Sequence, residues 1–129
     1  MDSLLDAMPF ARELGIELLA ASAEEVRARI PWSARLCTTG GVLHGGVVMA
    51  LADSAGALCA FLNLPPGGAT STIESKTNFF RAVREGHVEA VARPLHLGRS
   101  TIVVQTDVLD ASGRRVAQVT QTQAVLQPG

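Results

Sequence analysis

The feature that most constrains this chain is one long apolar segment, which begins at Gly45 or Gly46 and ends at Asn63. It is apolar on every side of a helical projection and rich in alanine and glycine, a pattern that predicts a buried helix. The Leu-Pro-Pro-Gly-Gly run that follows ends the helix. The only charged residue of the apolar segment is Asp53, and an aspartate in the middle of such a segment disfavours a transmembrane helix. The rest of the chain must therefore cover this helix.

The sequence on both sides of the helix favours β-structure. Residues 26–32 alternate apolar and charged side chains with the period of a half-buried strand. Further strands are expected over residues 15–21, 70–80, 88–97, 100–109 and 115–126. Residues 2–14 are expected to form one amphipathic helix, and residues 33–43 a loop. Antiparallel strands joined by tight turns must cover the central helix, so we predict an α+β fold in a single domain, residues 1–129, with one curved antiparallel sheet wrapped around that helix.

Composition argues against several classes of function. The net charge is −1 and the basic residues are scattered, whereas nucleic-acid-binding proteins usually carry a basic stripe. Cys37 and Cys59 form no CxxC pair and are expected to be free thiols, and the three histidines suggest no metal site. The acidic N-terminus lacks the basic region of a signal peptide, which favours a cytoplasmic protein without membrane association. A mean hydropathy of +0.25 is consistent with apolar surface buried between subunits.

Asp53 has two interpretations at this stage. A charged residue among apolar ones is usually a structural carboxylate, but it can also be a catalytic base or nucleophile. The glycine-rich segment 38–46 favours catalysis, because glycines leave the first N–H groups of the helix uncovered. Those donors and a helix dipole of roughly half a charge favour a negative oxygen, as in an oxyanion hole. The glycines could equally form a simple tight turn, and His44 alone would more often be structural.

The spacing within the helix argues for more than one subunit. Gly45 and Asp53 would lie about 12 Å apart on a helix that rises 1.5 Å per residue, too far for both to reach one carbonyl group. If the two act together, Asp53 of one chain must meet Gly45 of another, as in antiparallel helices related by a two-fold axis. Small residues would permit this approach: Ala50, Ala52, Ala55, Gly56 and Ala57. We therefore expect a homodimer at least.

One motif and its spacing carry a resemblance to a known family. Gly41-x-x-His44-Gly45-Gly46 is followed by an acid nine residues after the histidine. Together with the sequences at residues 79–82, 97–100 and 113–117, this motif resembles the hotdog-fold acyl-CoA thioesterases of the phenylacetate-degradation (PaaI) type. The resemblance covers nearly the whole chain. It implies the hotdog fold, an acyl-CoA substrate, no cofactor and, because relatives are often dimers of dimers, a homotetramer.

The resemblance also gives single residues expected roles. The Gly45 N–H would bind the thioester oxygen, Asp53 of the partner subunit would be the general base or nucleophile, and His44 would help to orient the site. Thr72 matches a position that orients the attacking water, although threonine is ordinary in a strand. The expected substrate-binding residues are Thr38, Gly46, Arg81, Arg99, Ser100 and Thr101. Thr38 departs from the family, which usually has Asn or Gln there, and the arginines are equally consistent with ordinary solvated side chains.

The leaving group of a thioester is a thiolate, which needs no strong acid to protonate it. One carboxylate and one oxyanion hole therefore suffice for hydrolysis without a metal. Two alternatives stay open: a hotdog hydratase or dehydratase acting on enoyl or hydroxyacyl thioesters, and a non-catalytic acyl-CoA-binding module. The nine-residue interval disfavours the first, and the short acidic N-terminus supplies no DNA-binding helices for the second. The acyl group is open between aryl, arylacetyl and medium-chain acyl. The expected pocket includes Leu43, Val47, Leu58 and residues of the 70–80 strand.

Overall fold

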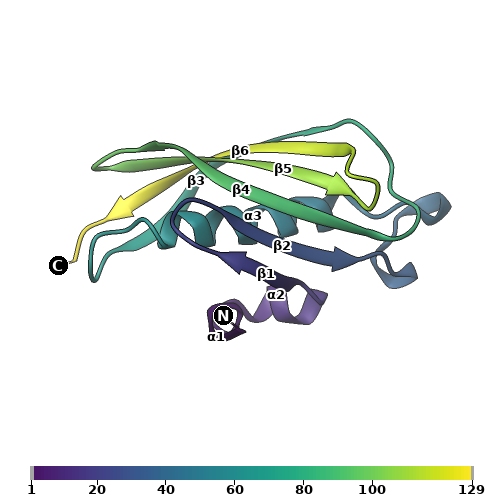
Figure 1. Ribbon diagram of the computed structural model, residues 1–129, viewed down its shortest axis with the longest axis horizontal. Helices are drawn as coiled ribbons and strands as arrows, with labels where there is room; N and C mark the ends of the chain where they lie inside the picture. Colours follow the sequence, from purple (N-terminus) through teal and green to yellow (C-terminus); the bar gives the residue numbers. More distant parts are fainter. Residues whose placement is uncertain (1, 129) are drawn as a thin grey trace.

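In the computed structural model, which describes residues 2–128, the long helix α3 (Gly45–Phe61) lies along one face of a curved antiparallel sheet (Figure 1). The sheet has six strands in the order β1-β2-β4-β5-β6-β3. Their bounds are β1 (Glu17–Ala21), β2 (Val26–Pro31), β3 (Ala69–Phe79), β4 (His87–Leu97), β5 (Thr101–Asp110) and β6 (Arg115–Leu126). This is the hotdog architecture expected from the sequence, and each strand lies within two residues of its predicted bounds.

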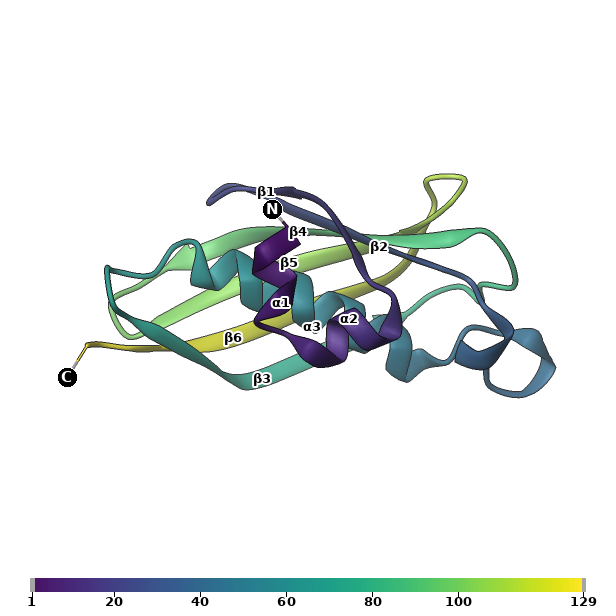
Figure 2. The ribbon, with the colours of Figure 1, turned by 90° about the horizontal axis from the view of Figure 1, so that it is seen from below.

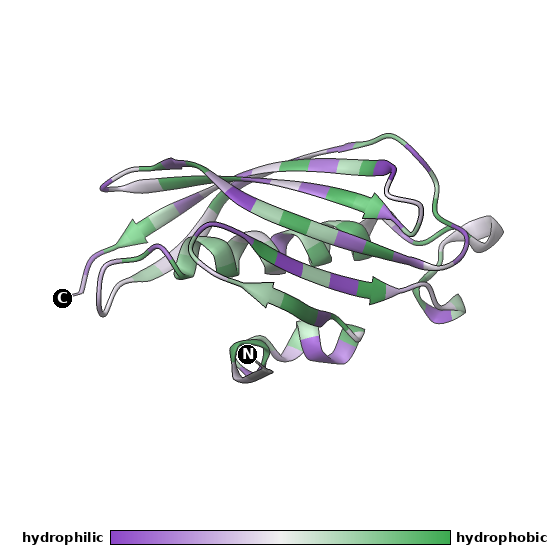
Figure 3. Cartoon of the chain, viewed as in Figure 1, coloured by the Kyte–Doolittle hydropathy of each residue, from purple (hydrophilic) through white to green (hydrophobic). Residues whose placement is uncertain are grey.

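The core lies between α3 and the concave face of the sheet. Strand β5 alternates buried and half-buried residues, and its inward residues Ile102, Val104 and Val108 are at most 2 % exposed. From the helix, Leu51, Ala52, Ala55, Leu58 and Cys59 pack against this face. Figure 3 shows the apolar character of α3 and the alternation along the strands. The period-2 pattern of the strands therefore decides which side of the sheet the helix covers.

The N-terminal segment differs from its prediction. Residues 2–14 form two helices, α1 (Asp2–Asp6) and α2 (Pro9–Leu14), instead of one. Pro9 lacks an N–H and forces the residue before it out of the helical region, and Met8 accordingly has φ −124° and ψ 78°. Gly15 ends α2 in the left-handed conformation, at φ 90°. Seen from below, α1 and α2 lie in front of α3, on the side away from the sheet (Figure 2).

The predicted loop at residues 33–43 contains two short 3-10 turns, η1 (Ala34–Leu36) and η2 (Thr39–Gly41), and a β-bridge that pairs Cys37 with Leu43. The indole N–H of Trp32 donates to the Gly41 carbonyl at 3.0 Å. Gly40 and Gly41 both have positive φ, which a residue with a side chain rarely adopts. These contacts set the path of the chain into α3.

One face of α3 is not covered by this chain, so the expectation of a helix buried on every side is wrong for a single subunit. Met49 and Phe61 are 42 % and 51 % exposed, and Asp53 is exposed between them. Beside the helix, β3 is a sheet edge, and none of its 11 residues is buried. We call this the α3–β3 surface; it comprises Met49, Asp53, Phe61, Ile73, Phe79 and Phe80. Five of the six residues are large and apolar, which marks an interaction surface.

Among residues 2–128, no helix has both the length and the apolar character needed to cross a membrane. In the same range no group of three or more His, Cys, Asp or Glu side chains is placed to hold a metal ion. Both cysteines are free thiols, as predicted: Cys59 is buried and Cys37 is half-buried.

Candidate active site

The start of α3 leaves one backbone donor unused. His44 is the N-cap, and its Nδ1 accepts a hydrogen bond from the Gly46 N–H at 2.8 Å. The His44 carbonyl accepts from Val47 N at 2.9 Å and from Val48 N at 3.4 Å. Within residues 2–128 the Gly45 N–H has no hydrogen-bond partner. A single N–H at the positive end of the helix dipole is therefore available to an oxyanion.

The turn that carries this donor is held on both sides. The backbone N–H of His44 donates to Leu36 O at 2.9 Å, and the N–H of Leu43 donates to Val83 O at 2.8 Å. Thr38 N donates to Val42 O at 2.8 Å. Neighbouring segments thus fix the position of the Gly45 N–H, as electrostatic stabilisation of a developing charge requires.

Asp53 lies two turns further along α3, on the α3–β3 surface. Its side chain is exposed, whereas the sequence suggested a charge buried in an apolar helix. Gln121 Nε2 donates to Oδ1 at 3.4 Å, and Thr72 on β3 also hydrogen-bonds the carboxylate. Partial desolvation by the surrounding protein outweighs both bonds and raises the pKa of the carboxyl above its ordinary 3.8.

Two glutamines of β6 were missed by the sequence reasoning. Gln121 and Gln123 are 0 % and 1 % exposed, and both face the helix. Gln123 Nε2 donates to Thr72 Oγ1 at 2.8 Å, and Thr70 Oγ1 donates to Gln123 Oε1 at 3.1 Å. The available signal was their position: they occupy inward places of a period-2 strand whose other inward residues, Ala117 and Val119, are apolar.

A cavity of about 380 Å³ adjoins the Gly45 turn. It is lined by Thr38, Val42, Leu43, Gly45, Val48, Phe79, Phe80, Arg81, Ala82, Val83 and Val116. The Phe79 ring lies against Gly45, since a Cβ atom there would be 3.2 Å from Phe79 Cζ. Three of the predicted site residues, Thr38, Gly45 and Arg81, therefore do meet at one cavity.

The structure does not bring the other predicted CoA-binding residues to this cavity. Arg81 follows Phe79, which pairs with Ala117 at the beginning of β6, whereas the Ser100 carbonyl accepts a hydrogen bond from Val125 N at the end of β6. Those ends are about 26 Å apart at 3.3 Å per residue. In one chain, Arg99, Ser100 and Thr101 thus lie far from Gly45. Likewise, Asp53 comes eight positions after Gly45 on the helix, about 12 Å along its axis.

A second cavity, of about 450 Å³, lies on the Asp53 side of α3. Its lining comes from α1 and the turn that follows it, from α3 and from the start of β3: Ser3, Leu4, Ala7, Met8, Ala57, Leu58, Phe61, Gly68, Ala69 and Thr70. Ala57 and Phe61 are one and two turns beyond Asp53 on the same side of the helix. Of the predicted pocket residues, Leu43 lines the first cavity and Leu58 the second; Val47 lines neither of the two.

Comparisons with known proteins show the family to which this chain belongs. Residues 40–117 match the family model of the thioesterase superfamily, a range that includes Gly45, Asp53 and Thr72. The chain is 33 % identical to the proofreading thioesterase EntH of Cronobacter turicensis over 88 % of this chain and 82 % of that protein. It is also 33 % identical to 1,4-dihydroxy-2-naphthoyl-CoA hydrolase of Escherichia coli, over 80 % and 76 % of the two chains.

A solved structure gives the same picture. A variant of the phenylacetic acid degradation protein PaaI from Thermus thermophilus superposes with a TM-score of 0.81 at 31 % identity, over 90 % of this chain and 97 % of that one. The fold and the match define a hotdog-fold enzyme of PaaI-like type. The chain belongs to the thioesterase superfamily and is a thioester hydrolase, so the class of enzyme predicted from the sequence is confirmed.

Proposed function

We propose that this enzyme is an acyl-CoA thioesterase whose active sites are shared between two subunits. The observation that carries the proposal is the arrangement on α3: a free Gly45 N–H at the helix start and a partly desolvated Asp53 about 12 Å further on. CoA is the proposed carrier because the E. coli relative is named as a CoA-thioester hydrolase. Acyl-CoA chemistry also favours action in the cytoplasm.

The α3–β3 surface is the proposed dimer interface. Its apolar side chains and unpaired edge strand would be covered by the same surface of a second copy, an isologous two-fold contact. Antiparallel α3 helices would then place Asp53 of each subunit near Gly45 of the other and form two equal sites. Pairs of such dimers would give the expected homotetramer.

The proposed chemistry uses few groups. Asp53 takes a proton from water as the water oxygen attacks the thioester carbonyl carbon, or its carboxylate attacks directly and water then hydrolyses the resulting mixed anhydride to release the acid. The Gly45 N–H stabilises the oxyanion, the C–S bond breaks, and CoA leaves as a thiolate that needs no strong acid. Thr72 hydrogen-bonds Asp53 from β3. Because His44 Nδ1 accepts from Gly46, the neutral ring carries its proton on Nε2, where it can donate to a bound group.

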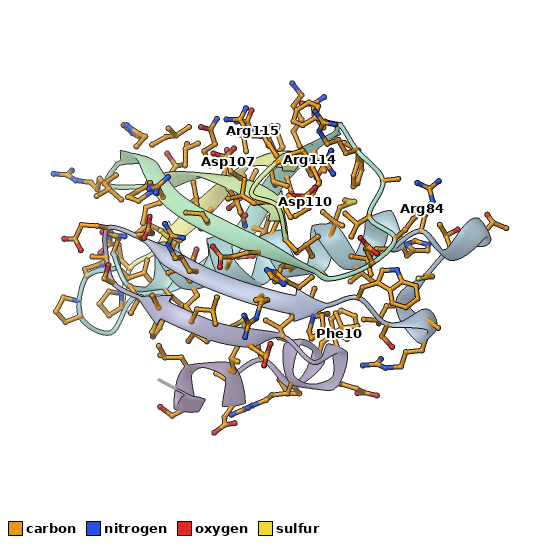
Figure 4. All side chains as sticks on the ribbon, turned by 45° about the vertical axis from the view of Figure 1, so that its right-hand side comes forward. Phe10, Arg84, Asp107, Asp110, Arg114 and Arg115 are labelled. Atoms are coloured by element: carbon orange, nitrogen blue, oxygen red, sulfur yellow. The ribbon has the colours of Figure 1, made fainter. Side chains whose placement is uncertain are left out.

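The CoA phosphates would lie at the outer end of the Gly45 cavity. Arg81 lines it, and Arg84 follows on the loop between β3 and β4; neither has an ion pair within residues 2–128. Figure 4 shows Arg84 apart from Asp110 and Asp107, which pair with Arg114 and Arg115 at 3.1 and 3.2 Å.

In a two-fold dimer with antiparallel α3 helices, the end of the partner that carries Arg99, Ser100 and Thr101 would lie beside Arg81. These residues can therefore act together as predicted, provided that they come from different chains. We propose that Arg81 and the partner's Arg99 contact the CoA phosphates, with Ser100 and Thr101 as further polar contacts. Gly46 and Thr38 would lie at the inner end of the Gly45 cavity, near the acyl group of the bound thioester.

The second cavity is the proposed site of the acyl group. It lies beyond Asp53 and is lined mainly by apolar side chains, Leu4, Met8, Leu58 and Phe61 among them. Such a lining favours an apolar aryl or medium-chain acyl group over a charged one.

Thiol release from a panel of acyl-CoAs tests the proposal, with wild type and Asp53→Asn compared. Wild type should release CoA from aryl or medium-chain substrates, and Asp53→Asn should lose about 100-fold or more in kcat, the usual contribution of a general base. An Asp53→Asn enzyme as fast as wild type would refute the role of Asp53. Consumption of an enoyl-CoA without thiol release would instead indicate a hydratase.

A further inference from the structure

Gln121 is an anomaly in the core. Its carboxamide is fully buried on the inward face of β6, and its Oε1 atom has no hydrogen-bond partner within residues 2–128. A buried polar group without a partner destabilises a fold, and an apolar side chain of the same shape would avoid that cost. The position therefore calls for a reason other than packing.

Within residues 2–128, the one hydrogen bond of the Gln121 side chain is with Asp53. Nε2 donates to Asp53 Oδ1 at 3.4 Å, a long hydrogen bond. A carboxylate accepts only, so the NH₂ group must face Asp53 and Oε1 must face the opposite way. This orientation accounts for the unpartnered oxygen.

Gly56 makes room for this carboxamide. It lies three residues after Asp53 on α3, and a Cβ atom there would be 2.0 Å from Gln121 Oε1 and 2.5 Å from Cδ. Both distances are far below van der Waals contact, so any side chain at position 56 must displace Gln121. The Gln121 carboxamide can therefore keep its present place only with glycine at position 56.

A second buried amide, that of Gln123, hydrogen-bonds the other partner of Asp53, Thr72. Gln123 Nε2 donates to Thr72 Oγ1 at 2.8 Å, and Thr72 hydrogen-bonds Asp53. The carboxylate is thus held directly by Gln121 and indirectly by Gln123, from adjacent inward positions of one strand. These are the only inward polar residues of β6.

We propose that Gln121 is a positioning residue for the reaction: it holds Asp53 Oδ1 in place, through the space that Gly56 leaves, so that the other carboxylate oxygen faces the substrate. The inference rests on the proposed function in that Asp53 performs the chemistry. It adds a role for a buried side chain that has no access to the substrate.

No charged group complicates the titration of Asp53 within residues 2–128, since the pKa has only three causes: desolvation, Thr72 and Gln121. The charged residues of β3, Glu74 and Lys76, pair with the outward residues Thr122 and Thr120. Most charged residues of the other packed elements form ion pairs: Arg27 with Glu25 and Glu89, Arg29 with Glu17, Arg93 with Glu25, Arg115 with Asp107, Arg114 with Asp110, and Arg12 with Asp6. Glu13 of α2 is exposed, and His87 of β4 is half-buried. His96 of β4 is exposed beyond Arg93.

The test is Gln121→Met, which keeps the length of the side chain and removes the donor. We expect kcat to fall about tenfold with KM within about twofold of wild type, since a long hydrogen bond to a charged group is at the weak end of its range. Losing a donor to the carboxylate should also move the acid limb of the pH profile of kcat/KM to higher pH. A tenfold loss with an unmoved pH profile would overturn the proposal, because it would indicate a merely structural role.

Gly56→Ala is the second variant, and it keeps Gln121 itself. Alanine favours the helix by about 1 kcal/mol, so folding should survive while the carboxamide is displaced. Its kinetic effect should match that of Gln121→Met, and the double variant should be no worse than either single one. Additive losses would contradict the coupling. Thr106→Val is the matched control: Thr106 is equally buried on β5 and its hydroxyl has no partner, so kinetics should not change.

The carboxyl ¹³C titration of Asp53, assigned by its loss in Asp53→Asn, separates this inference from the proposed function. Gln121→Met should raise the pKa of Asp53 whether or not Asp53 is catalytic. If the pKa does not move, the positioning role is wrong even though Asp53→Asn may be inactive. If the pKa rises but Asp53→Asn keeps full activity, the proposed function fails, and Gln121 then positions a carboxylate that takes no part in the reaction.

Discussion

Mixed oligomers give the sharpest test of a shared active site. One chain would carry Gly45→Pro and the other Asp53→Asn. If each site joins Gly45 of one subunit to Asp53 of the other, a heterodimer contains one intact site and one site that lacks both groups. If each site lay within one chain, no combination of the two variants could restore activity.

The structure indicates that Gly45→Pro will fold. Position 45 is the first residue of α3, where proline is tolerated because its missing N–H has no helical partner. His44 has φ −60° and ψ 133°, the extended conformation that a residue before proline prefers. The added ring does approach Phe79, so Gly45→Ala is the control: it brings the same Cβ to 3.2 Å from Phe79 Cζ but keeps the N–H.

The expected magnitudes follow from counting sites. Each parent should lose about 100-fold or more, the usual contribution of one oxyanion donor or one general base. Equal amounts of the two chains, unfolded together and reassembled at random, give about half heterodimers, so the mixture should regain about a quarter of wild-type activity. Heterodimers isolated through two different tags should regain about half. The assay is thiol release from the best acyl-CoA of the panel. Verified heterodimers that stay at the level of the parents would refute the shared site.

Three further outcomes are expected. Leu51→Ala, at a fully buried position of α3, should lower the free energy of unfolding by about 2–5 kcal/mol in a denaturant titration. Asp53→Asn should be at least as stable as wild type at neutral pH. The raised folded-state pKa of Asp53 means that the free energy of unfolding of wild type falls as pH rises through that pKa. The difference between the two proteins should vanish below about pH 4, where the carboxyl is neutral in the unfolded chain as well. Cys59 should resist thiol reagents that modify Cys37, because burial raises the pKa of Cys59 to about 11; mass spectrometry of the labelled native protein checks this.

The fold could be read from the sequence because local and global signals agree. The strands follow from period-2 patterning, and the central helix from an apolar run that Pro65 and Pro66 end. The N-terminal helix was mispredicted because its amphipathic spacing continues across Pro9, whose covalent geometry outweighs the pattern. Asp53 was predicted to be buried because a sequence cannot show which side of an apolar helix its own chain covers.

The site could be predicted only in part, because local spacing is visible in the sequence and long-range pairing is not. Motif spacing placed Gly45 and Asp53 on one helix and showed that one chain could not bring them together. It could not place Arg81 and Arg99 at opposite ends of the sheet, because that follows from strand order and register, which are long-range pairings. Gln121 escaped notice because a polar residue in a strand is ordinary until the facing direction is known.

The inward amides of β6 show how such a residue can be recognised. In a sheet that packs a helix, an inward polar side chain costs about 1–3 kcal/mol for each group left unpaired, and an apolar one would avoid that cost. Gln121 has this disadvantage, with Oε1 unpartnered, and it additionally requires Gly56 in the middle of α3, where glycine is about 1 kcal/mol less favourable than alanine. Two linked destabilising features thus meet at the side chain that hydrogen-bonds Asp53. Because an apolar side chain at position 121 would avoid the unpaired group, we explain the pair by the site that it serves, since folds break local rules where function requires it.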